Sequence, residues 1–74
     1  MKIELDIPDN IATIINDFLQ FQANKPDSIS SHGPLDMQTL ALMLLQDVYW
    51  ATERPGSWEG ANMRQVLEAH GYFI

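Results

Sequence analysis

The chain has 74 residues, with ten acidic residues against four basic ones, and it contains no cysteine. This length allows one domain with a small core, and the lack of cysteine excludes disulfides, thiolate metal sites and a cysteine nucleophile. Hydrophobic residues make up 46% of the chain, too many for a disordered protein. Because small folds usually need a disulfide, a metal or a second subunit, we expect an oligomer.

The net charge of −6 argues against general binding to DNA, because proteins bind this polyanion largely by neutralising its phosphates with Lys and Arg. A local basic patch could still bind DNA, but the basic residues form no cluster. They are Lys2, Lys25, Arg54 and Arg64.

Two further observations bear on localisation. The longest apolar run, residues 40 to 45, is far shorter than a membrane span. The N-terminus lacks the basic region, apolar run and cleavage site of a secretory signal. We expect a cytoplasmic protein.

Residues 2 to 8 alternate apolar and polar side chains, a pattern typical of a strand with one buried and one exposed face. The apolar face consists of Ile3, Leu5 and Ile7, and the polar face consists of Lys2, Glu4 and Asp6. The sequence therefore predicts a short N-terminal strand.

A first helix is predicted over about residues 9 to 22. Pro8, Asp9 and Asn10 are typical of a helix start, where a proline suits the first turn and polar side chains cap free amides. Apolar residues then recur on one helical face, which needs a cover. They are Ile11, Ile14, Ile15, Phe18 and Leu19.

Residues 23 to 34 contain two prolines, a glycine and three serines, which predicts a loop. Asp36 is then the expected cap of a second helix, which is apolar nearly all round. One stripe contains Met37, Leu40, Ala41, Leu44, Val48 and Ala51, and it is widened by Leu42, Met43, Leu45, Tyr49 and Trp50. Such a helix is buried on more than one side, and in so short a chain this implies a second subunit.

Pro55 and Gly56 predict a turn that ends the second helix. Ser57 is the expected cap of a third helix, and Gly71 occupies the usual stop position. The inner face of this helix contains Met63, Val66, Leu67 and His70, and an apolar tail follows at residues 72 to 74.

The order of a strand, an amphipathic helix, a loop and a strongly apolar helix resembles the ribbon-helix-helix (Arc/MetJ-like) superfamily. The matching segments are KIELDIPDNIATIINDFL and DMQTLALMLLQDVYWA, within about residues 1 to 52. The match is one of pattern, without a diagnostic motif.

The resemblance implies a mainly α single domain over residues 1 to 74, with one short N-terminal strand and an added C-terminal helix and tail at 57 to 74. Two chains would pair their strands and interlock their second helices as an intertwined homodimer. The dimer core would contain Ile3, Leu5, Ile7, Leu40, Leu44 and Val48.

In that superfamily, outward strand side chains read DNA bases, and by position these are Lys2, Glu4 and Asp6 here. A carboxylate accepts only from cytosine and is repelled by phosphates. The superfamily also holds phosphate on free amides at the start of the second helix, where this chain has Pro34 and Asp36. These departures indicate that the DNA-reading face is lost. A protein partner would then bind the ribbon face, the acidic surface or the C-terminal segment.

Other candidate residues have ordinary alternatives. His32 and His70 lack a second ligand at metal spacing and any triad pattern, so neither a metal, a cofactor nor catalysis is expected. The methionines at 37, 43 and 63 fit gap-filling in a core better than an adaptable surface. Tyr49, Trp50 and Trp58 fit either a small satellite core or the anchors of an interface.

Two functions remain open, and neither is enzymatic. The first is an acidic dimeric interaction protein that binds or inhibits a protein partner with a basic or nucleic-acid-binding surface. Short acidic chains of this sort are similar to phage or mobile-element inhibitors, including anti-CRISPR proteins. The second is a ribbon-helix-helix transcriptional repressor or antitoxin that binds operator DNA.

Overall fold

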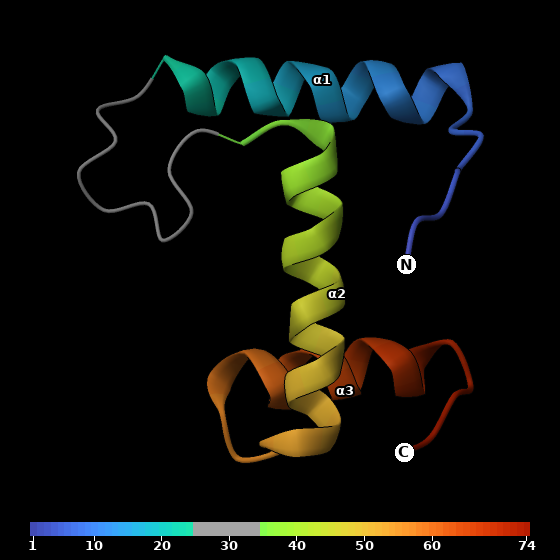
Figure 1. Cartoon of the computed structure of the whole chain (residues 1–74), viewed down its shortest axis with the longest axis vertical. Coiled ribbons are helices and arrows are strands. Elements are labelled where there is room, and N and C mark those ends of the chain that lie inside the picture. Colours follow the sequence, from blue (N-terminus) through green and yellow to red (C-terminus); the bar gives the residue numbers. More distant parts are fainter. Residues whose placement is uncertain (25–34) are drawn as a thin grey trace. The chain divides into compact units, whose positions relative to one another are not determined.

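The structure is a computed structural model that describes residues 1–24 and 35–74. Within these residues it contains three helices and no strand: α1 (Asp9–Ala23), α2 (Met37–Glu53) and α3 (Trp58–Ala69) (Figure 1). The described part of the chain is therefore all-α. The chain divides into two compact units, Met1–Thr39 and Leu40–Ile74.

The strand predicted for residues 2 to 8 is not present in the single chain, where this segment has neither helical nor strand structure. A strand is defined by a ladder of hydrogen bonds to another strand, and the described residues of one chain provide no partner for it. The apolar side chains of Ile3 and Leu5 are accordingly exposed.

Helix α1 begins one residue after Pro8, as the sequence predicts, and ends one residue later than expected. The carbonyl oxygen of Pro8 accepts hydrogen bonds from the amides of Ile11, at 3.0 Å, and Ala12, at 2.9 Å. The expected side-chain cap is wrong, since no side chain caps this end. Asp9 instead lies in the first turn, where the helix dipole favours a negative charge.

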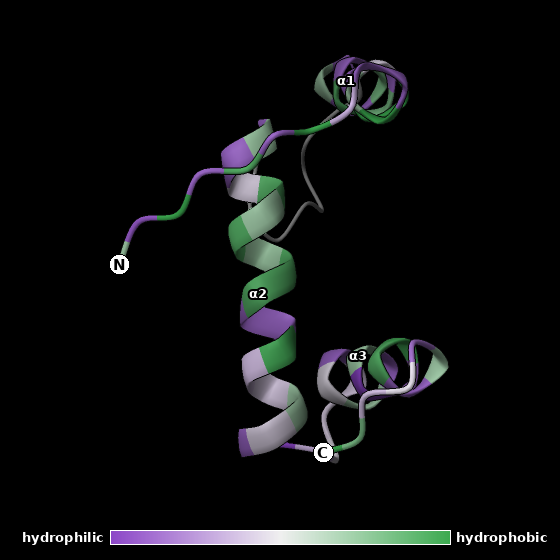
Figure 2. Ribbon diagram, turned by 90° about the vertical axis from the view of Figure 1, so that its right-hand side faces the viewer, coloured by the Kyte–Doolittle hydropathy of each residue, from purple (hydrophilic) through white to green (hydrophobic). Residues whose placement is uncertain are grey.

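Helix α2 begins with the predicted cap. The carboxylate of Asp36 accepts a hydrogen bond from the amide of Thr39 at 2.7 Å, which satisfies one of the donors that a helix start leaves free. Figure 2 shows hydrophobic residues along most of this helix. Even so, none of the helices in the described ranges is long and apolar enough to cross a membrane.

Both predicted ends of α3 are confirmed. At its start, the hydroxyl oxygen of Ser57 accepts a hydrogen bond from the amide of Gly60 at 3.1 Å. At its end, Gly71 adopts a φ of 88°, in the left-handed region that favours glycine. The amide of Tyr72 donates to the carbonyl of Leu67, and that of Gly71 donates to Glu68, both at 2.9 Å. This pair of bonds is a Schellman motif.

A tight turn joins α2 to α3 and brings their backbones together at Gly60. The carbonyl of Arg54 accepts hydrogen bonds from the amide of Ser57 at 3.0 Å and from its hydroxyl at 2.8 Å. A Cβ added to Gly60 would lie 2.6 Å from the carbonyl oxygen of Trp50 and 2.7 Å from that of Arg54. Because these are backbone atoms, they cannot move aside cheaply, so the corner requires glycine.

The turn between α2 and α3 predicts that alanine at Gly60 lowers stability and that alanine at Gly56 does not. Gly60→Ala should destabilise the fold by about 1–3 kcal/mol, the usual cost of overpacking. Gly56→Ala is the matched control, because an added Cβ there meets nothing within 4 Å, and it should leave stability nearly unchanged. Thermal unfolding followed by circular dichroism at one protein concentration measures both effects. Equal midpoints for the two variants would contradict the close approach at Gly60.

Candidate partner-binding surfaces

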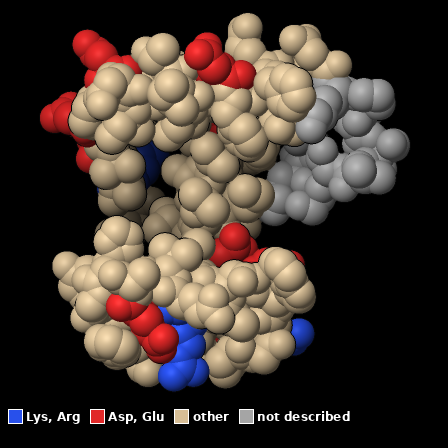
Figure 3. All heavy atoms as spheres, turned by 180° about the vertical axis from the view of Figure 1, so that it is seen from behind, with Lys and Arg blue, Asp and Glu red and all other residues tan. Residues whose placement is uncertain are grey.

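The polar residues of the N-terminal segment form an exposed acidic surface. Lys2, Glu4 and Asp6 are all exposed, so the structure leaves the predicted partner-binding residues available. The ion pair found in the described part of the chain lies elsewhere, where Arg64 Nε is 3.0 Å from Glu68 Oε1. Figure 3 shows acidic side chains spread over the visible face with few basic ones beside them.

The predicted aromatic anchors do not form one cluster. Tyr49 and Trp50 make an edge-to-face contact with ring centroids 4.9 Å apart, and the guanidinium of Arg54 lies 5.5 Å from the centre of the Trp50 ring. Trp58 is 81% exposed, and within the described residues no ring contact joins it to the other two. The pair of Tyr49 and Trp50 is therefore the better formed anchor.

The contact of Arg54 with Trp50 was missed by the sequence reasoning, although its signal is simple. The two residues are four positions apart, the spacing at which side chains meet along a helix. An arginine over an indole face is attracted by the ring quadrupole. Arg54 therefore helps to hold Trp50 against the end of α2, and its side chain is part of the same surface.

Large apolar side chains are exposed throughout the described residues. The buried hydrophobic residues there are Leu19 and Ala51. Of the expected dimer core, Ile3, Leu5 and Leu44 are exposed, while Ile7, Leu40 and Val48 are half-buried. Exposed hydrophobic residues also include Ile11, Ile14, Phe18, Phe21, Leu42, Leu45, Tyr49, Val66, Tyr72, Phe73 and Ile74. This much exposed apolar surface is typical of a protein that binds another protein.

The start of α2 is electrostatically unsuited to phosphate. Asp36 already accepts the hydrogen bond of the Thr39 amide, and the hydrogen bonds from the amide and the side chain of Thr39 lower the pKa of Asp36 below its usual 3.8. The carboxylate is thus ionised at neutral pH and lies where a phosphate would bind to free amides. Its charge would repel that phosphate.

His70 is exposed and is the C-cap residue of α3, whereas His32 lies outside the described residues. No group of three or more His, Asp or Glu side chains within the described ranges could hold a metal ion.

Comparison with known proteins adds no relative: no family model, no curated protein and no solved structure matches the chain.

The cap at Asp36 predicts a specific pH dependence of stability. Because the folded-state pKa is lowered, the stabilisation is fully present above the unfolded value of 3.8 and is lost as the pH falls through the lower folded value. Asp36→Asn should be less thermostable than the wild type near neutral pH, and this difference should disappear in acid. Thermal unfolding followed from about pH 6 down to about pH 2 measures it.

Asp17→Asn is the control, because Asp17 lies inside α1 and caps no helix. A constant difference between Asp36→Asn and the wild type at every pH would contradict the role of the ionised cap.

Proposed function

We propose that this protein is a small acidic homodimer that binds and inhibits a protein partner through the partner's basic, nucleic-acid-binding surface. Its unpaired carboxylates carry the proposal. Among the described acidic residues, only Glu68 takes part in an ion pair, and the rest of the acidic charge is available to an outside partner. Complementary charge raises the rate of association and excludes wrong partners.

The N-terminal segment is the proposed centre of this acidic surface. Glu4 and Asp6 are exposed, and the next acidic residue, Asp9, is the first residue of α1. Lys2 is the one basic residue among the first 24. A surface of this composition resembles nucleic acid in charge, so it competes for the same partner. We infer that the protein is a phage or mobile-element accessory of the anti-CRISPR type.

The capped start of α2 favours this proposal over a DNA-binding repressor. A repressor needs donors and positive charge at the groove and at the phosphates. Here the amide of Thr39 already donates a hydrogen bond to Asp36. In the N-terminal segment, two of the three exposed residues Lys2, Glu4 and Asp6 are acidic. Operator binding is therefore the outcome that would refute the proposal.

The homodimer is supported by the small buried core. Leu19 and Ala51 are the buried hydrophobic side chains of the described residues, and burial of apolar surface is the main favourable term in folding. A chain of this size without disulfides gains the missing burial from a second copy. Folding and dimerisation should then occur together.

Removal of the N-terminal charge should abolish partner binding. Glu4→Gln combined with Asp6→Asn keeps the side-chain shapes and removes two carboxylates. Glu53→Gln combined with Glu59→Gln removes the same charge from exposed positions in the 40–74 unit and serves as the control. Each immobilised protein is loaded with nuclease-treated cell lysate. We expect the wild type and the control to retain a basic protein that added duplex DNA elutes, and the N-terminal variant to lose it.

The same proteins should give no sequence-specific shift of duplex DNA at physiological salt, because binding seen only at low salt is generic. A specific shift by the wild type that Lys2→Ala removes would establish the repressor function instead.

Coupled folding and dimerisation predict that the midpoint of thermal unfolding rises with protein concentration. Val48→Asp should unfold the protein, because it would place an unpaired charge on the half-buried apolar face of α2. Gln46→Asp adds the same charge at an exposed polar position of the same helix and should leave the fold intact. Circular dichroism and sedimentation measure both. A folded wild-type monomer at micromolar concentration would contradict the homodimer.

A further inference from the structure

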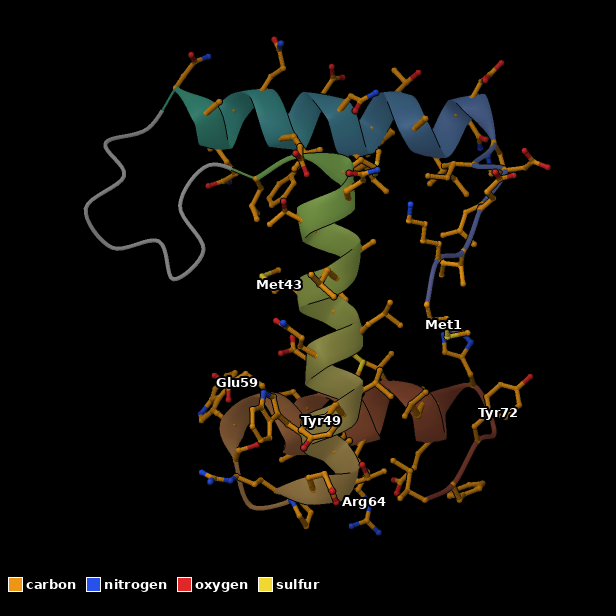
Figure 4. The ribbon with its side chains drawn as sticks, viewed as in Figure 1. Met1, Met43, Tyr49, Glu59, Arg64 and Tyr72 are labelled. Atoms are coloured by element: carbon orange, nitrogen blue, oxygen red, sulfur yellow. The ribbon has the colours of Figure 1, made fainter. Side chains whose placement is uncertain are left out.

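Helix α2 carries a seam of residues that is separate from the core stripe expected from the sequence. Its positions alternate in steps of four and three along the helix, the spacing of the contact line in paired helices. They are Gln38, Leu42, Leu45, Tyr49 and Thr52. The three central side chains are apolar and remain 56%, 53% and 55% exposed. Figure 4 labels Tyr49 near the C-terminal end of this seam.

The seam carries no charge, although the chain is strongly acidic. Residues 37 to 46 contain no Asp, Glu, Lys or Arg. Asp47 lies two positions after Leu45 and two before Tyr49, and a separation of two residues turns a helix by about 200°, so Asp47 lies on the side opposite the seam. A basic partner would find nothing to pair with here.

A second copy of the chain fits this lack of charge. Each copy carries a net charge of −6, so two identical surfaces approach without strong repulsion only where acidic residues are missing. The seam meets that condition over residues 37 to 46, and the first acidic residue on its side is Glu53, one turn after Tyr49 at the end of α2. It is also self-complementary, as a two-fold contact requires.

The other face of α2 is the one that turns toward its own chain. It contains Leu40, Leu44, Val48 and Ala51. Ala51 is buried, and α3 approaches at this end of α2 through the contact of Gly60 with the Trp50 carbonyl. One helix thus has two apolar faces. On the face near α3, Leu40 and Val48 are half-buried and Leu44 is 43% exposed, whereas all three apolar seam residues are more than half exposed.

We propose that the seam at Leu42, Leu45 and Tyr49 packs against the same seam of a second copy, so that two α2 helices pair along their length. This inference rests on the proposed homodimer and assigns the surface that forms it. It differs from the core expected from the sequence, which used Leu40, Leu44 and Val48.

Disulfide trapping tests the seam directly, because the chain has no native cysteine. Leu45 is the middle apolar position, so it lies beside its own copy whether the two helices run parallel or antiparallel. A disulfide forms only when the two Cβ atoms come within about 4.5 Å. Leu45→Cys should therefore give a covalent dimer under mild oxidation. Asp47→Cys, on the side of α2 opposite the seam, is the control and should stay monomeric on a non-reducing gel.

A charge placed in the seam provides the second test. Leu45→Lys should shift the sedimenting species from dimer to monomer, and Gln46→Lys, which adds the same charge beside the seam, should leave it dimeric. The dimer of the wild type should also persist at high salt, whereas binding of a basic partner should weaken, because salt screens exposed charges.

The possible failures are distinguishable. If the wild type sediments as a dimer and Leu45→Cys does not cross-link, another face forms the dimer and this inference is wrong, while the proposed homodimer stands. If the wild type is a folded monomer, both are wrong, and the seam is covered by another part of the chain or by a different protein. Partner capture by the wild type is scored separately and tests the acidic surface alone.

Discussion

The main physical constraint on this protein is the small size of its hydrophobic core. A chain of 74 residues without disulfides has few ways to bury apolar surface, and in the described residues the buried hydrophobic side chains are Leu19 and Ala51. Folding must offset the loss of backbone and side-chain entropy mainly through such burial. Each of the three helices keeps apolar side chains exposed, so little of this stabilisation comes from burial within the described residues.

The N-terminal segment and helix α2 differ in charge, and this difference indicates which kind of partner suits each surface. The N-terminal segment combines exposed carboxylates with a single lysine, whereas the first ten residues of α2 carry no charge at all. We propose that a basic protein binds through the first surface by electrostatic attraction and that a second copy packs against the second. The charged residues of the first surface and the apolar residues of the second are different, so the two proposed interactions can be tested separately.

The caps of α2 and α3 and the end of α3 were predictable because the responsible interactions are local, whereas the side-chain cap expected at the start of α1 is absent. Asp36 caps α2 through Thr39, three residues later, and Ser57 caps α3 through Gly60 in the same way. Gly71 stops α3 because a left-handed residue is needed there. The strand predicted over residues 2 to 8 was wrong for the single chain. Alternation of apolar and polar residues shows which faces a strand would have, but a strand also needs a second strand to hydrogen-bond with.

The sequence by itself determined the helical content, the caps, the acidic excess and the doubly apolar character of α2, because each follows from composition or from residues within one turn of each other. Only the tertiary structure decided which glycine the α2–α3 corner requires, that Arg54 lies over Trp50, and that Trp58 stands apart from the other aromatic residues. It also separated the partly covered face of α2 from the exposed seam at Leu42, Leu45 and Tyr49. Both faces are apolar in sequence, and their exposure differs only in the folded chain, where Ala51 is buried at the end of α2 that Gly60 of α3 approaches.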